Sequence, residues 1–341
     1  MNYWRFPLLL VSLLLLAGGI KSLLDYWQYD EIASDVAQLM LQQVTADEIR
    51  QNIREAIAAD NPSDARMYLS LAQTFGYPIS SVEFQADLAR LESPLNTARR
   101  TVNDFTSGFV AGDAANGAGV AGAIAADFTV VGDVRDLWEQ YQIHAKGEEV
   151  SPLIVTLAGV GVGLTAATVA SMGATTPVKG GVSTTKLAAR TGRLTPNFQK
   201  LLLKQSSDVF NYQAFLLAAR AERSMDGIGK AAVKAYNPQA MQALQGTAER
   251  VNNIRKASST ADALHVLKYV DNADDLVRLE KLSLKYGTEA KGILKFLGKS
   301  AIGTVRILRK SVELFVSVLV TLISLVSTGL SLAGFRRPSS A

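Results

Sequence analysis

Long uncharged stretches alternate with segments of ordinary polarity along this chain. The clearest of them are residues 6–20, 152–172 and 314–332. A helix needs about twenty apolar residues to cross a bilayer, and the first stretch reaches that length when it is extended to Tyr26 and Trp27. Aromatic residues at both of its ends are typical of interfacial anchoring. The pattern predicts an all-α integral membrane protein with N-terminal and C-terminal transmembrane helices, over 1–24 and 311–335, and a short tail over 336–341.

The first uncharged stretch also has features of a secretory signal peptide. Arg5 followed by a leucine run resembles the charged and apolar regions of such a peptide. Ala17-Gly18-Gly19 is, however, a poor cleavage site. We therefore favour an uncleaved anchor.

A polar region over 25–106 carries the spacing of short helices. Thr45 and Glu48 form a capping box ahead of three isoleucines at helical spacing. Asn61-Pro62 then supplies a cap and a first-turn proline for a second helix, which Gly76 ends. This helix pair could be one unit of a repeat array, but no second copy recurs at a fixed period. We expect a small helical domain.

The segment over 107–173 is rich in glycine and alanine and contains few charges. Its first part, 107–131, fits a re-entrant or interfacial helix, a poor spanning helix packed against partners, or a buried soluble helix. Asp113 and Asp127 lie within it, and Asp133 follows it. Acids at membrane depth often mark ion or proton paths, whereas a helix cap or a position at the water interface is the simpler interpretation.

Residues 152–172 form the best candidate for a central transmembrane helix. No charged residue interrupts them, and Gly159, Gly163 and Ala167 recur four apart. Small residues at this spacing let two helices approach closely in lipid, so they predict helix packing and a homo-oligomer formed through 159–167. The alternative is a buried hairpin of helices in a water-soluble protein.

A second interpretation of this stretch is a nucleotide site. Gly161-x-Gly163-x-x-Ala166 matches the dinucleotide fingerprint, in which glycines let a pyrophosphate approach a helix N-terminus. The fingerprint also needs an acid about twenty residues later, and none occurs between Glu149 and Asp208. Helix packing is therefore the preferred interpretation.

The two polar regions have opposite charge. From Asp25 to Asp104 six Lys/Arg stand against thirteen Asp/Glu, a net charge of −7. From Val178 to Lys310 twenty-three stand against ten, a net charge of +13. A division this wide suggests that the two regions face different surroundings.

The second polar region, 174–310, also reads as short helices, including one that Asp271 caps and Gly287 ends. It closes with an amphipathic juxtamembrane helix over 289–310. Anionic lipid head groups would attract the basic face of this helix, and the alternative is a solvated face that only reinforces orientation. A nucleic-acid partner is not expected, because a basic cluster alone is unspecific. The cations that share this face are Lys291, Lys295, Lys299, Arg306, Arg309 and Lys310.

Composition removes much enzyme chemistry. The chain has no cysteine and only two histidines, so thiolate metal sites, cysteine nucleophiles and histidine-rich metal sites are excluded. His265 follows Asp262 by three residues, which makes at most an incomplete metal site. No nucleophile elbow or phosphate loop stands out. We predict no catalytic residue, no metal and no cofactor.

The residues from Val131 to Leu137, Val-Gly-Asp-Val-Arg-Asp-Leu, and the Gly-rich span after them resemble the hydrophobic pre-toxin modules of bacterial polymorphic toxins. The resemblance covers about a tenth of the chain and implies a bacterial membrane-associated module. No recognisable toxin domain follows, and the resemblance supplies no catalytic residue.

These patterns together predict a non-enzymatic scaffold or interaction protein anchored in the bacterial inner (cytoplasmic) membrane as a multi-pass protein. Its expected partners are the lipid bilayer and an unidentified protein. Charge placement favours three crossings, with the N-terminus and the basic region in the cytoplasm. The alternative function is a membrane-active protein (a channel, a transport accessory or a toxin component) that uses the Gly/Ala-rich segment.

Overall fold

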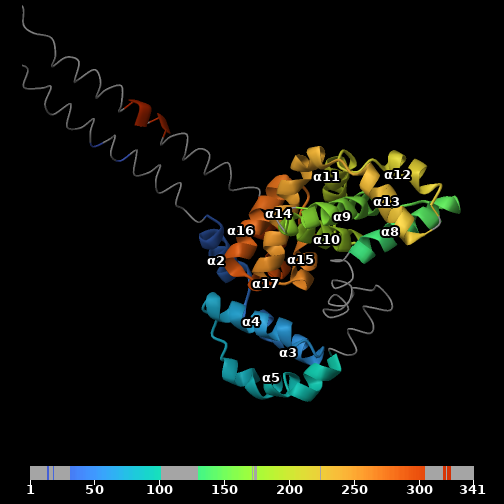
Figure 1. Ribbon diagram of the computed structural model, residues 1–341. Helices are drawn as coiled ribbons and strands as arrows, with labels where there is room; N and C mark the ends of the chain where they lie inside the picture. The colour runs from blue at the N-terminus through green and yellow to red at the C-terminus, as the bar shows by residue number, and fades with distance from the viewer. Residues whose placement is uncertain are drawn as a thin grey trace, which may run out of the picture. The chain divides into compact units, whose positions relative to one another are not determined.

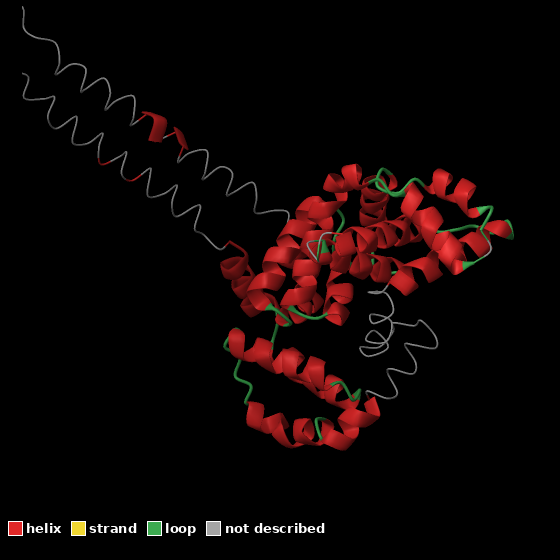
Figure 2. Cartoon of the chain, in the orientation of Figure 1, coloured by secondary structure: helices red, strands yellow, loops and turns green. Residues whose placement is uncertain are grey.

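The computed structural model describes residues 31–100, 130–170, 172, 175–222 and 224–303, and a few isolated positions near each end of the chain. The described residues are almost all helical and contain no strand (Figure 2). An isolated bridge pairs Phe210 with Tyr236. The predicted all-α class is confirmed.

The helices fall into two groups along the chain (Figure 1). The N-terminal group is α2 (Glu31–Gln43), α3 (Ala46–Ala58), α4 (Pro62–Thr74), η1 (Ser81–Phe84) and α5 (Gln85–Leu91). The second group is α8 (Val130–Ala145), α9 (Pro152–Ala170), α10 (Thr176–Arg190), α11 (Pro196–Ser207), α12 (Tyr212–Ala219), α13 (Met225–Ala235), η2 (Pro238–Met241), α14 (Gln242–Ala257), α15 (Thr260–Leu267), α16 (Ala273–Tyr286), α17 (Glu289–Leu297) and η3 (Gly298–Ile302).

By its contacts the chain divides into two units. One comprises Asp35–Ile302, and the other comprises Met1–Ser34 with Gly303–Ala341. The acidic polar region from Asp35 onward and the basic polar region up to Ile302 therefore belong to one unit.

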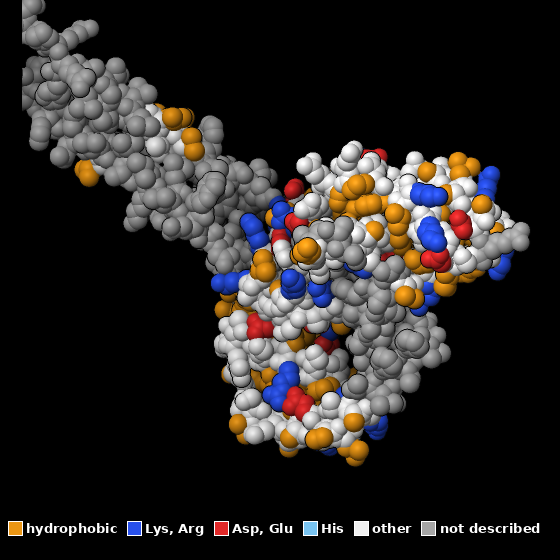
Figure 3. All heavy atoms as spheres, in the orientation of Figure 1, with side chains coloured by type: hydrophobic (Ala, Val, Ile, Leu, Met, Phe, Trp, Pro, Cys, Tyr) orange, Lys and Arg blue, Asp and Glu red, His pale blue; other side chains and the backbone are white. Residues whose placement is uncertain are grey.

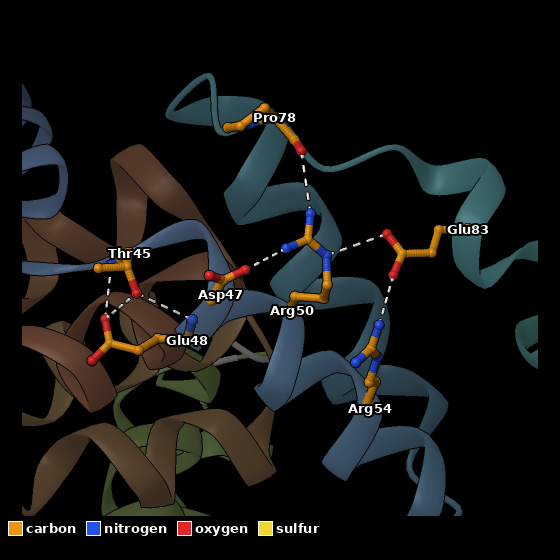
Figure 4. A network of polar contacts seen from close by, with 7 residues as sticks. All are labelled: Thr45, Asp47, Glu48, Arg50, Arg54, Pro78 and Glu83. Atoms are coloured by element: carbon orange, nitrogen blue, oxygen red, sulfur yellow. Dashed lines mark hydrogen bonds and ion pairs between the residues drawn. The ribbon is translucent and has the colours of Figure 1, made fainter.

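Local sequence signals set the N-terminal helices as expected. The capping box is present at Thr45, whose side chain accepts from the backbone N–H of Glu48 while the Glu48 carboxylate accepts from the backbone N–H of Thr45 (Figure 4). Two arginines of α3, Arg50 and Arg54, then reach the carboxylate of Glu83 in η1. Asn61 caps α4 ahead of its first-turn proline. The predicted helix pair is confirmed.

Helix α9 lies in the interior of the second group, where α8, α10, α11 and α13 pack around it. Leu157, Ala158, Val160 and Leu164 on it are at most 1% exposed. A helix that is apolar on all sides must be covered on all sides. The neighbouring helices of the same chain supply that cover for α9.

Among the residues that the structure describes, no helix is long and apolar enough to cross a membrane. This finding contradicts the predicted integral membrane protein and its multi-pass location in the inner membrane. The error is clearest at 152–172, because an interior helix and a spanning helix share the same lack of charge. The predicted spans over 1–24 and 311–335 lie outside the described residues, apart from isolated positions.

The helices at the end of the unit differ from the prediction in two ways. Asn272, not Asp271, caps α16 by accepting from the N–H of Asp275. The helix predicted over 289–310 ends at Leu297, because Gly298 adopts a φ of +57° at its C-cap. Gly287 does end α16, with a φ of +56°. Positive φ values cost glycine little, so both positions stop a helix efficiently.

Candidate functional site

Two charged pairs on separate helices meet inside the second group. Helix α8 carries Asp133 and Asp136 one turn apart, and α10 carries Lys186 and Arg190 one turn apart. The Lys186 Nζ lies 2.6 Å from Asp133 Oδ1 and 2.6 Å from Asp136 Oδ2. Arg190 Nη1 lies 2.7 Å from Asp136 Oδ1. We call these four side chains the buried ion network.

Three members of the network are closed to solvent. The side chains of Asp133, Asp136 and Lys186 are each 1% exposed, whereas that of Arg190 is 24% exposed. Buried charges need close partners, because removal from water costs each ion several kcal/mol. The short distances in the network meet this requirement, and Arg190 connects it to the surface.

The glycines of α9 create the space for this network and for two aromatic rings. A Cβ on Gly161 would lie 2.4 Å from Asp133 Oδ2. A Cβ on Gly159 would lie 2.3 Å from the ring of Phe210, and one on Gly163 would lie 2.2 Å from the ring of Tyr236. The chain passes close to α9 at each of these positions, and only glycine leaves room for that approach.

The surroundings of these glycines bear on both interpretations of residues 152–172, helix packing and a nucleotide site. Gly159 and Gly163 do pack closely, but their partners are aromatic side chains of the same chain, while Ala167 is partly exposed. Gly161 faces a carboxylate from the middle of a helix, and a carboxylate would repel the pyrophosphate of a dinucleotide. The geometry therefore favours packing over nucleotide binding.

Burial changes the protonation behaviour of the network. It raises the pKa of Asp133 to about 6, against the opposing effect of the nearby Lys186 ammonium. Burial also lowers the pKa of the neighbouring Lys179, which donates a hydrogen bond to Thr165 Oγ1. Asp133 is neither the helix cap nor the interfacial residue that the sequence suggested, but a core carboxylate.

The basic face predicted over 291–310 is described only in its first half. There, Lys291 pairs with Asp64 at 2.5 Å and Asp262 at 3.4 Å. Lys295 donates a hydrogen bond to Asn52 Oδ1, and its Nζ lies 5.1 Å from the centre of the Tyr68 ring. Lys299 pairs with Asp271 and, at 2.9 Å, with Asp275. Each of the three contacts groups of the same chain. The predicted residues Arg306, Arg309 and Lys310, like Asp113 and Asp127, lie outside the described residues.

The contacts of Lys291 and Lys295 belong to a close packing of α4 against α17. A Cβ on Gly292 would lie 2.5 Å from Met67 Sδ, so the two helices approach tightly at this glycine. The rings of Tyr68 and Phe296 meet edge to face with centres 5.9 Å apart. Glu289 is 9% exposed and accepts from two hydroxyls of α4. The acidic and basic regions, expected to face different surroundings, contact each other here.

His265 makes no metal site in the described chain. Its Nδ1 lies 2.8 Å from the carbonyl oxygen of Ala261, and burial lowers its pKa. Asp262 instead accepts from Ser259 and pairs with Lys291. No cluster of three potential metal ligands occurs among the described residues.

Sequence reasoning did not single out Lys186 or Arg190. Their four-residue spacing places two cations on one helical face, and the spacing of Asp133 and Asp136 does the same for two acids. These signals were visible, but 53 residues separate Asp133 from Lys186 along the chain. No local pattern indicates that the two faces meet. Comparison with protein families, with curated proteins and with solved structures gives no match to this chain.

Proposed function

We propose that the chain is a non-enzymatic helical scaffold that acts by binding a protein partner on its surface. The charged side chains that could do acid–base chemistry in the buried ion network are closed to solvent and held by one another. A substrate would have to displace packed helices to reach them. Their arrangement supports a structural role, in which a buried ion network fixes how helices pack.

The observation that carries the binding role is a set of exposed apolar side chains on α12 and α13. Leu217 is 65% exposed, Val233 46% and Met225 44%, and the two helices pack against each other. Hydrophobic, basic and acidic side chains lie side by side over this part of the unit (Figure 3). Single exposed apolar residues are ordinary, whereas several on neighbouring helices are typical of interaction sites. A protein with an apolar patch of its own fits such a surface.

Site-specific photo-crosslinking in the producing cell tests this function. A photoreactive residue at Val233 should capture one defined protein, and Leu217→Asp in the same chain should abolish that capture. Gln213→Asp is the matched control, because Gln213 is an exposed polar residue on the same helix. It should leave the capture unchanged, and thermal unfolding should confirm that both variants remain folded.

The opposite result is equally clear. If the crosslinks from position 233 are the same with Leu217→Asp as without it, α12 and α13 do not form the binding surface. If no protein is captured at position 233, the proposed scaffold function is contradicted.

A further inference from the structure

The buried carboxylate of Asp133 accepts few hydrogen bonds. Its Oδ1 accepts from Lys186 Nζ at 2.6 Å. Its Oδ2 is buried and has no hydrogen-bond partner among the described residues. Asp136 Oδ2 likewise lacks a hydrogen-bond partner among the described residues, but both oxygens of Asp136 have a cation within 2.7 Å, Lys186 at Oδ2 and Arg190 at Oδ1. Of the two acids, Asp133 is therefore the one that is costly to keep ionised.

The charges of the closed side chains do not balance. Asp133 and Asp136 are acids, and among the residues that the structure describes Lys186 is the one base as deeply buried as they are. Arg190 is 24% exposed, so water shares its charge. Lys179, also partly buried, faces Asp133 from α10. One added proton would neutralise the closed part of the network.

Among the described helices, α9 and α13 pack on α8, and neither contributes a buried charge. No charged residue occurs in α9 from Pro152 to Ala170. On α13, Asp226 and Lys230 are 77% and 70% exposed and pair with each other, and Lys234 is also exposed. On α8 itself, Arg135 is 42% exposed and lies 3.7 Å from Asp136. The balance at Asp133 therefore depends on the network and Lys179.

The geometry beside Oδ2 selects a proton over a metal ion. A Cβ on Gly161 would lie 2.4 Å from that oxygen, so the backbone of α9 fills the space next to it. A metal ion would need several oxygen ligands at more than 2 Å from its centre. A proton adds almost no volume.

We infer that Asp133 is a proton-binding site of the folded chain, and that proton binding there strengthens the packing of α8 and α10 on α9. The pKa of Asp133, raised by burial to about 6, agrees with this inference. The ordinary value of 3.8 applies in the unfolded chain. Between these values the folded chain holds a proton that the unfolded chain does not, so a fall in pH stabilises the fold. The packing around Asp133 is therefore more stable in mild acid than at neutral pH.

The test compares the full chain with Asp133→Asn, in which an amide replaces the protonated acid. Unfolding by urea should be measured at pH 6.5 and pH 4.5. Across this window the unfolding constant of the native chain should fall by roughly tenfold to thirtyfold relative to that of Asp133→Asn, as expected for uptake of one proton. Asp226→Asn, which removes an exposed acid, should keep the native pH dependence.

Hydrogen exchange supplies a local readout. After correction for the intrinsic exchange rate, amides of α8 in the native chain should exchange more slowly at pH 5 than at pH 7.5, and those of Asp133→Asn should not. Equal pH dependence in the two proteins would overturn the inference. If Asp133→Asn does not fold, carboxyl-carbon NMR of the native chain decides. A buried aspartate titrating near pH 6 supports the site, and the absence of one overturns it.

Discussion

The ammonium of Lys186 lies 2.6 Å from a carboxylate oxygen of Asp133, and both side chains are 1% exposed. One residue belongs to α10 and the other to α8, and both helices pack on α9. This pair ties together elements that are far apart in the sequence. The packing of α8, α9 and α10 therefore depends on the charge of two side chains as well as on apolar contacts.

Removal of the buried Lys186 ammonium should strongly destabilise the fold. Lys186→Met keeps the length and apolar stem of the side chain but leaves two buried carboxylates without their shared partner. We expect a loss of about 3–5 kcal/mol in the free energy of unfolding, measured by urea denaturation. Lys230→Met, at an exposed lysine that also pairs with an acid, should change the stability little. Comparable effects of the two substitutions would show that the network does not stabilise the fold.

Gly161 should tolerate no side chain while Asp133 is present. Gly161→Ala would place a Cβ 2.4 Å from the carboxylate and should lower the stability by about 1–3 kcal/mol. In the Asp133→Ala background, the same change should cost less, because the clashing group is gone. Gly246→Ala is the control, since Gly246 is a helical glycine with no atom near its missing Cβ. It should gain about 0.5–1 kcal/mol. Equal costs of Gly161→Ala in both backgrounds would disprove the contact.

The contact between α4 and α17 should respond to charge reversal. Lys291→Glu places an acid beside Asp64 and Asp262, so we expect the stability to fall by roughly 2 kcal/mol in urea denaturation. Adding Asp64→Lys should restore part of the loss, because Asp262 still opposes the new acid. A double variant no more stable than Lys291→Glu alone would show that Lys291 and Asp64 do not interact.

His265 should act on stability in the direction opposite to Asp133. Burial lowers its pKa below the ordinary 6.5, so the unfolded chain takes up a proton first as the pH falls. Stability is therefore lost from about pH 6.5 downward, until the folded histidine is protonated as well. His265→Gln should remove this loss when the free energy of unfolding is compared at pH 7 and pH 5. An unchanged difference between the two pH values would mean that His265 does not contribute.

Local signals in the sequence predicted the local structure well. The capping box at Thr45, the start of α4 at Asn61 and the glycine stop at Gly287 depend only on neighbouring residues, and each is confirmed. The cap of α16 was displaced by one residue because Asp271 and Asn272 are both good capping residues. Asp271 is instead held by Lys299, a contact that no local pattern indicates.

The environment of α9 could not be predicted in the same way. The apolar composition of α9 predicts that every face of the helix is shielded from water. Both a bilayer and a shell of surrounding helices provide that shielding. The deciding fact is which segments surround it, and in the described part of the chain these are α8, α10, α11 and α13. The same limit applies to the candidate site. The charges of Asp133 and Lys186 are visible in the sequence, but their meeting depends on the tertiary fold.

The packing of α4 against α17 has a consequence for the synthesis of the chain. Asp64 leaves the ribosome 227 residues before Lys291, its partner. At about 5–20 residues per second, that interval lasts roughly 10–45 seconds. Throughout it, Met67 and the apolar side chains beside it on α4 lack the surface that will cover them. Exposed apolar surface on a nascent chain favours binding by chaperones. A pause late in translation would prolong the exposure of these α4 side chains.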